Sequence, residues 1–129
     1  MTFTASDGRT FRIQYVHSAH DLRFRNEGTP GGLRQFVDNL AASLRRRVTL
    51  CEISLVTLTG AVDGDGRALT QAIPLAQGFA LCHFHDQFVK RLGRGYALAR
   101  ALSIADFDVQ TAAEIADFCD FEYEDLRDL

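Results

Sequence analysis

The sequence predicts a single α+β domain over residues 1–129, in which an antiparallel sheet of about four strands is packed on one face by helices, in the order ββαββαα. Three observations lead to this prediction. Alternating apolar segments flank a turn signal, other stretches have the apolar period of helices, and the turns between expected strands are too short for parallel crossovers. With 129 residues and 47% hydrophobic side chains, the chain can bury a core as one domain.

Two strands are expected over residues 3–5 and 9–16, on either side of the tripeptide Ser6-Asp7-Gly8. An Asp-Gly pair between alternating segments is typical of a β-hairpin, because glycine readily adopts a positive φ. The polar residues 17–30 that follow are expected to continue as an extended edge and then a loop.

An amphipathic helix is expected over residues 33–44. Its apolar residues recur at the spacing of one helical face: Leu33, Phe36, Val37, Leu40, Ala41 and Leu44. The triplet Arg45-Arg46-Arg47 then follows, where positive charge is favoured by the negative end of the helix dipole. These arginines fit either a solvated last turn or part of a cationic binding surface.

Two further strands are expected over residues 48–59 and 78–84, with a turn over residues 60–66. The first of them is rich in β-branched residues and leucine, but its alternation breaks at Glu52 and Ser54. This break predicts either a sheet covered partly on both faces or a β-bulge.

The next element is a helix over residues 86–102, beginning near His85 or Asp86. Helical spacing places five apolar residues on one arc, namely Phe88, Leu92, Tyr96, Ala99 and Leu102. The roughly opposite arc carries Lys90, Arg91 and Arg94.

Gly93 and Gly95 lie inside this helix, where each glycine costs about 1 kcal/mol relative to alanine. Glycines at such positions predict a close approach of another backbone, either the chain's own sheet or that of a partner. Packing within the chain is the interpretation that we favour.

The C-terminal part, about residues 108–129, is expected to form an acidic helix that starts with a capping box at Thr111 and Glu114. Charge is strongly separated: residues 1–105 hold 13 Lys and Arg against 8 Asp and Glu, whereas residues 106–129 hold one Arg against nine acids. Five carboxylates of this helix are candidate protein-binding residues: Asp117, Asp120, Glu122, Glu124 and Asp125.

This separation predicts a charged partner, and it leaves two hypotheses. In the first, the acidic helix imitates a phosphate backbone and occupies the nucleic-acid channel of a host protein or ribonucleoprotein complex. In the second, the basic helix binds duplex RNA or DNA directly through several cations. The candidate cations for the second hypothesis are Lys90, Arg91, Arg94, Arg45, Arg46 and Arg47.

A third alternative is a zinc-stabilised domain. Its ligands would be the pairs His17 with His20 and Cys82 with His85, because four nitrogen and sulfur ligands are what zinc prefers. These two pairs belong to segments that could form adjacent strands. The leading hypotheses require neither zinc nor any other cofactor.

No sequence feature points to an enzyme: there is no P-loop, no dinucleotide fingerprint and no Gly-x-Ser-x-Gly. Three widely spaced cysteines do not indicate a disulfide framework, and they predict a reducing compartment. No apolar run approaches the ~20 residues that span a bilayer, and the N-terminus lacks a leader pattern. We therefore expect a cytoplasmic protein without a membrane partner.

One segment resembles a known pattern. It reads Cys82-x3-Asp86-x-Phe88-x-Lys90-x2-Gly93-Arg94-x2-Ala97-x2-Arg100-Ala101-Leu102. This segment, about a sixth of the chain, is similar to a recurring stretch in small proteins of phages and mobile elements, although His83 and His85 differ from that stretch. The resemblance implies a phage-type accessory protein that binds and inhibits host machinery, as anti-CRISPR proteins do.

Overall fold

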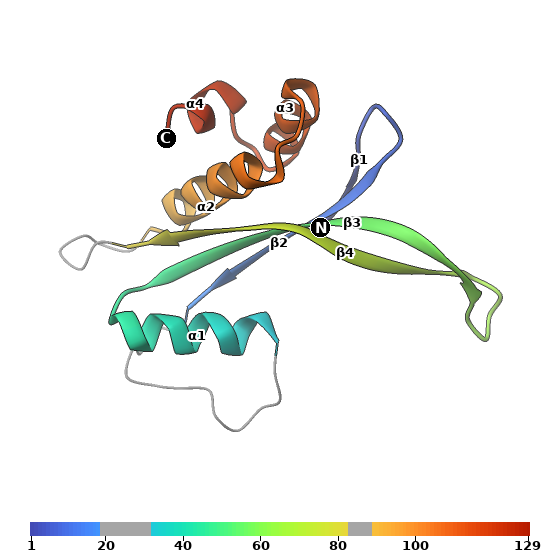
Figure 1. The fold of residues 1–129 in the computed structure, drawn as a ribbon, viewed down its shortest axis with the longest axis horizontal. Helices are drawn as coiled ribbons and strands as arrows, with labels where there is room; N and C mark the ends of the chain where they lie inside the picture. The colour runs from blue at the N-terminus through green and yellow to red at the C-terminus, as the bar shows by residue number, and fades with distance from the viewer. Residues whose placement is uncertain (19–31, 83–88) are drawn as a thin grey trace.

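The computed structural model describes residues 1–18, 32–82 and 89–129, which form one antiparallel sheet and four helices. The strands are β1 (Thr2–Thr4), β2 (Thr10–His17), β3 (Val48–Val62) and β4 (Ala68–Leu81), and they follow one another across the sheet in chain order. The helices are α1 (Leu33–Leu44), α2 (Lys90–Ala105), α3 (Val109–Phe118) and α4 (Tyr123–Arg127). The predicted fold class and element order are confirmed, with α4 as an additional helix (Figure 1).

The predicted hairpin between β1 and β2 is present. Gly8 has a φ of 93°, and its amide donates to the carbonyl oxygen of Ala5 at 3.0 Å. The strand expected over residues 78–84 starts much earlier than its pattern indicated, since β4 runs from Ala68 to Leu81, and residues 83–84 lie outside the described residues. Residues 68–77 alternate poorly, and pairing with β3 is what holds them extended.

The helices lie on both faces of the sheet, which corrects the expectation of a single helical layer. Helices α2, α3 and α4 cover one face, and α1 covers part of the other (Figure 1). The reason lies in β3, where Cys51 and Ile53 join the core under α2 while Val48 and Leu50 pack against α1.

The broken alternation of β3 therefore has both of the predicted causes. Glu52 is only 7% exposed and accepts a hydrogen bond from Gln77 Nε2 at 2.7 Å. The pairing register of β3 with β4 also shifts between Ile53 and Ser54, as in a β-bulge.

Helix α2 packs on the sheet mostly through residues outside the predicted apolar arc. Leu92 and Tyr96 are 61% and 42% exposed. The residues that α2 buries are instead Gly95, Ala97, Leu98, Ala101 and Leu102. Of the predicted arc, Leu102 is buried as expected, and Phe88 lies outside the described residues.

A glycine on β4 explains this choice of residues. A Cβ atom at Gly78 would overlap the carbonyl oxygen of Ala97 and the amide nitrogen of Ala101. The two backbones touch here, so larger side chains would hold the helix away from the strand.

The acidic C-terminal segment forms two helices instead of the single one expected. Helix α3 ends at Phe118, Asp120 has a φ of 64°, and α4 starts at Tyr123. The N-cap is also corrected: Asp108, not Thr111, caps α3, and its carboxylate accepts a hydrogen bond from the Thr111 amide at 2.9 Å. The Thr111 hydroxyl is instead a partner of Arg9, whose guanidinium donates to it at 3.0 Å.

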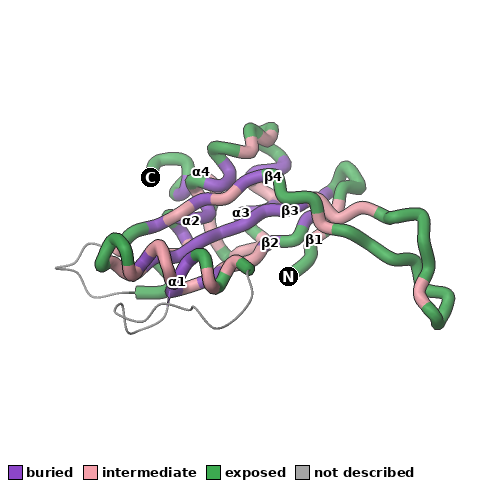
Figure 2. The backbone as a smooth tube through the Cα atoms, turned by 60° about the horizontal axis from the view of Figure 1, so that its bottom comes forward, coloured by how far each residue is buried: buried purple, intermediate pink, exposed green. Residues whose placement is uncertain are grey.

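The far part of the β3–β4 hairpin extends beyond the rest of the sheet (Figure 2). Strand β2 pairs with β3 only as far as Thr10 opposite Val56, and β3 and β4 continue alone to a turn at Asp63. We call residues 56–75 the arm.

Candidate functional site

The most distinctive surface lies where β2 ends and α2 begins. One hollow of about 480 Å³ is lined by the apolar and aromatic residues Tyr15 and Val16 and by the polar residues His17, Ser18, Arg34, Arg47 and Lys90. A second hollow of about 360 Å³ adjoins it and shares Tyr15 and His17 with it. The second hollow adds Arg91, Arg94 and Asp120 to the lining. We call the two hollows together the cationic cleft.

Gly93 brings α2 close to the sheet at this point. A Cβ atom there would lie 2.5 Å from Oγ1 of Thr49, so the helix passes directly over this β3 residue. The same Oγ1 atom is hydrogen-bonded to Nδ1 of His17 at 2.8 Å. The close approach at Gly93 is packing within the chain, as we favoured, but it is made with a side chain and not with the backbone that was predicted. It places the first turns of α2 beside His17.

Gly95 has the same kind of role on the other side of α2. A Cβ atom there would lie 3.1 Å from the ring of Phe121, in the link between α3 and α4. The guanidinium of Arg91 lies 4.7 Å from the centre of the same ring and donates to the carbonyl oxygen of Asp120 at 3.1 Å. The C-terminal segment is therefore fastened to α2 by packing, a cation–π contact and one hydrogen bond.

The pKa of His17 reflects the positive charge around the cleft. Its pKa is lowered from 6.5 to about 4, first by burial and then by the nearby cations Lys90, Arg94, Arg47 and Arg34, in that order. The imidazole is therefore neutral near pH 7, and the surrounding charges are those of lysine and arginine. A cleft with this field attracts anions.

The structure brings together only some of the predicted cations. Lys90, Arg94 and Arg47 meet around His17, and Arg91 lines the second hollow. Arg45 is the C-cap of α1 with a φ of 54°, and neither Arg45 nor Arg46 lines the cleft.

Sequence reasoning missed Arg34 as a member of this surface. It lies in the first turn of α1, where its Nε donates to Oδ2 of Asp38 at 3.2 Å. A single arginine in the first turn of a helix does not by itself indicate a binding site. Arg34 joins the cleft only because α1 packs beside the end of β2.

The residues of the zinc alternative are not brought together by adjacent strands. His17 ends β2 and Cys82 follows β4, and β3 separates the two strands. His20 and His85 lie outside the described residues. Over residues 1–18, 32–82 and 89–129, no three potential metal ligands form a group.

The five predicted protein-binding carboxylates are all exposed, at the end of α3, in the following link and on α4. Within the described ranges, no ion pair joins them to the cations of α2. Arg91 contacts the backbone of Asp120, not its carboxylate. Asp120 lines the second hollow of the cationic cleft, whereas the other four carboxylates line neither hollow and remain available to a partner.

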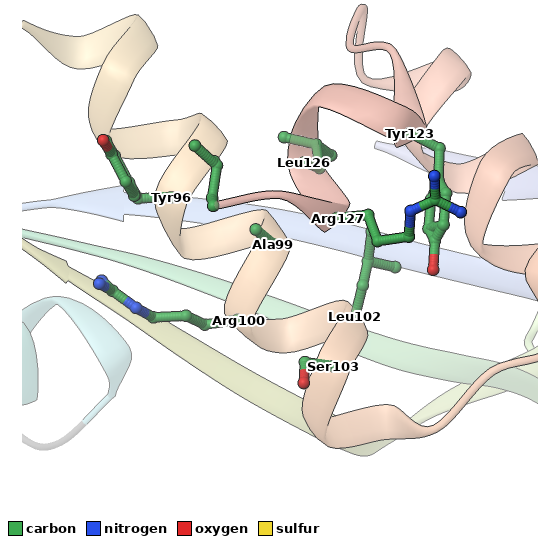
Figure 3. A pocket seen from close by; sticks show the side chains of 9 residues that line it. Tyr96, Ala99, Arg100, Leu102, Ser103, Tyr123, Leu126 and Arg127 are labelled. Carbon is green, nitrogen blue, oxygen red and sulfur yellow. The ribbon is translucent and has the colours of Figure 1, made fainter.

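A smaller groove of about 280 Å³ lies between α2 and α4 (Figure 3). Tyr96 and Arg100 extend from α2, while Tyr123 and Arg127 come from α4. Arg100 has a structural partner, since its Nη1 donates to the carbonyl oxygen of Phe79 on β4 at 2.6 Å. This groove was not predicted from the sequence.

Comparison with known proteins does not identify a family: no family model, no curated protein and no solved structure matches this chain. Among the helices of the described residues, none combines the length and the apolar character needed to cross a membrane. The function must therefore be inferred from the geometry of the surfaces.

Proposed function

We propose that this protein is a non-enzymatic accessory protein of phage type that binds the phosphate backbone of a duplex nucleic acid in the cationic cleft. One observation supports this proposal most directly: cations from α1, from α2 and from the residue before β3 surround a single neutral histidine. Phosphate groups bind where several lysine and arginine side chains converge, because binding releases the counterions of the nucleic acid.

In this proposal, the segment from Cys82 to Leu102 that is similar to phage proteins has a structural role and a binding role. Gly93, Ala97 and Ala101 seat α2 on the sheet, and Arg100 binds a β4 carbonyl oxygen. Lys90 and Arg94 have no such seating role and lie beside His17. We infer that the segment builds a helix that presents these two cations to a ligand in the cytoplasm.

The test is fluorescence anisotropy with labelled duplex DNA and duplex RNA over a series of salt concentrations. We expect the double variant Lys90→Ala/Arg94→Ala to bind roughly tenfold more weakly at low salt. The slope of log K against log salt should also decrease in magnitude by about 2, since two phosphate contacts are lost.

The control is Arg67→Ala/Arg127→Ala, which removes the same charge from exposed positions outside the cleft. It should bind as the unchanged protein does. No salt-dependent binding at low salt, or equal losses in the two double variants, would exclude the cleft as a nucleic-acid site.

The second candidate function is inhibition of a nucleic-acid-handling host complex, in the manner of anti-CRISPR proteins. It is supported by the five exposed carboxylates that have no cationic partner among the described side chains. These groups would occupy a cationic channel of a host protein or ribonucleoprotein complex in place of nucleic acid.

Competition with DNA for a purified CRISPR effector complex tests this candidate. We expect the unchanged protein to displace the DNA and Asp117→Asn/Glu122→Gln to displace it at least about tenfold less effectively. The control Asp65→Asn/Asp106→Asn removes two other exposed charges and should compete normally. Equal competition by both double variants, or none by the unchanged protein, would count against the mimic.

A further inference from the structure

The arm, residues 56–75, exposes large apolar side chains that no other part of the described chain covers. Leu58 is 70% exposed, Val62 is 64% and Ile73 is 44%. Both long edges of this ribbon are open, because the pairing of β2 with β3 ends at Val56 of β3 and because β4 is the last strand of the sheet. Figure 2 shows the arm exposed over most of its length.

The strands of the arm are also uncharged. Residues 53–62 and 68–81 contain no Lys, Arg, Asp or Glu, and the charges are confined to the turn at Asp63, Asp65 and Arg67. Natural edge strands usually carry charges that prevent pairing with another chain. A neutral apolar ribbon does not attract phosphate, so its partner is an apolar protein surface.

A two-stranded ribbon alone in water is at best marginally stable. In the arm, β3 and β4 pair as far as Leu58 opposite Thr70 and, after a register shift, again at Val62 opposite Ala68. We propose that a second copy of the chain covers it, so that two arms pack against each other antiparallel across a two-fold axis. An isologous interface needs a self-complementary surface, and an uncharged ribbon of leucine, valine, isoleucine and threonine fulfils this condition.

Charge complementarity also favours a second copy. In an antiparallel arrangement the turn of one arm lies at the base of the other. Arg12 is exposed at that base, opposite Ser54 in the β2–β3 register. The exposed carboxylate of Asp65 at the turn therefore meets the partner copy's Arg12 at each end of the interface.

Sedimentation equilibrium of the full chain tests the dimer. We expect a dimer whose dissociation constant rises more than about tenfold in Leu58→Glu/Thr70→Glu. These two residues pair with each other on the face of the arm that also carries Arg12, so both changes bury charge in the interface. The control is Leu92→Glu/Ile104→Glu, which replaces exposed residues of α2 and should leave the dimer intact. Circular dichroism verifies that each variant is folded.

A charge exchange provides a second, independent test. Arg12→Glu should weaken the dimer, and adding Asp65→Arg to the same chain should restore it, since each contact is then remade with reversed sign. A monomer at the highest concentration reached, or a dimer that withstands both arm substitutions, would overturn the proposal. Failure of the exchange to restore association would overturn the antiparallel arrangement.

Discussion

At the scale of single residues, His17 connects the fold with the candidate site. It was a predicted zinc ligand, and in the structure it is a neutral histidine bonded to Thr49 among four cations. Its position at the end of β2 follows from strand alternation. The charges around it come from α1, from α2 and from the residue before β3.

The depressed pKa of His17 predicts that acid weakens the fold. In the unfolded chain this histidine gains a proton near pH 6.5, but in the folded protein only near pH 4, so the unfolded state binds more protons in between. The free energy of unfolding should therefore fall as the pH decreases through this window.

Urea denaturation of the protein and of His17→Asn at pH 7 and pH 5 measures this contribution. The variant should lose less stability than the unchanged protein between the two pH values. Equal losses in both would show that His17 titrates normally in the folded state.

At the scale of elements, the seating of α2 on β4 decides where the cationic cleft forms. Gly78 and Gly93 each allow a contact that a Cβ atom would block, one in the middle of the helix and one in its first turn. Together they fix the height and the tilt of the helix above the sheet. The positions of Lys90 and Arg94 follow from this seating.

Gly78→Ala should accordingly destabilise the protein by about 3 kcal/mol, because the added methyl group meets backbone atoms that cannot rotate away. Gly64→Ala is the matched control, since the Cβ atom there meets nothing within 4 Å and Gly64 needs no positive φ. The control should change the stability by less than about 0.5 kcal/mol. Urea denaturation measures both, and similar values for the two variants would contradict this account of the packing.

At the scale of the whole molecule, the cleft and the arm lie at opposite ends of the sheet. His17 lies opposite Thr49 at one end, while the arm starts beyond Val56 at the other (Figure 1). In the proposed dimer the arms meet at the centre and the two clefts remain open at the far ends. A long duplex that reached both clefts would gain affinity from the second contact.

Much of the fold could be predicted from local pattern. The hairpin at Ser6-Asp7-Gly8 and the bounds of α1 depend on turn chemistry and on one apolar period, which act over a few residues. The charge separation is a property of composition and is equally visible in the sequence. The break in the apolar alternation of β3 at Glu52 predicted that both faces of the strand are covered, but it did not predict which helix covers which face.

The buried face of α2 and the membership of the cleft were decided only by tertiary structure. Ranking helix faces by hydrophobicity selected Leu92 and Tyr96, but contact with the backbone at Gly78 requires Ala97 and Ala101 instead. Arg34, Arg47 and Lys90 are far apart in the chain and carry no joint pattern. The sequence by itself determined the elements and the charges, because these are local. Which charges meet was decided by the packing of α1 and α2 around the end of β2, because close contact depends on the size of side chains from distant segments.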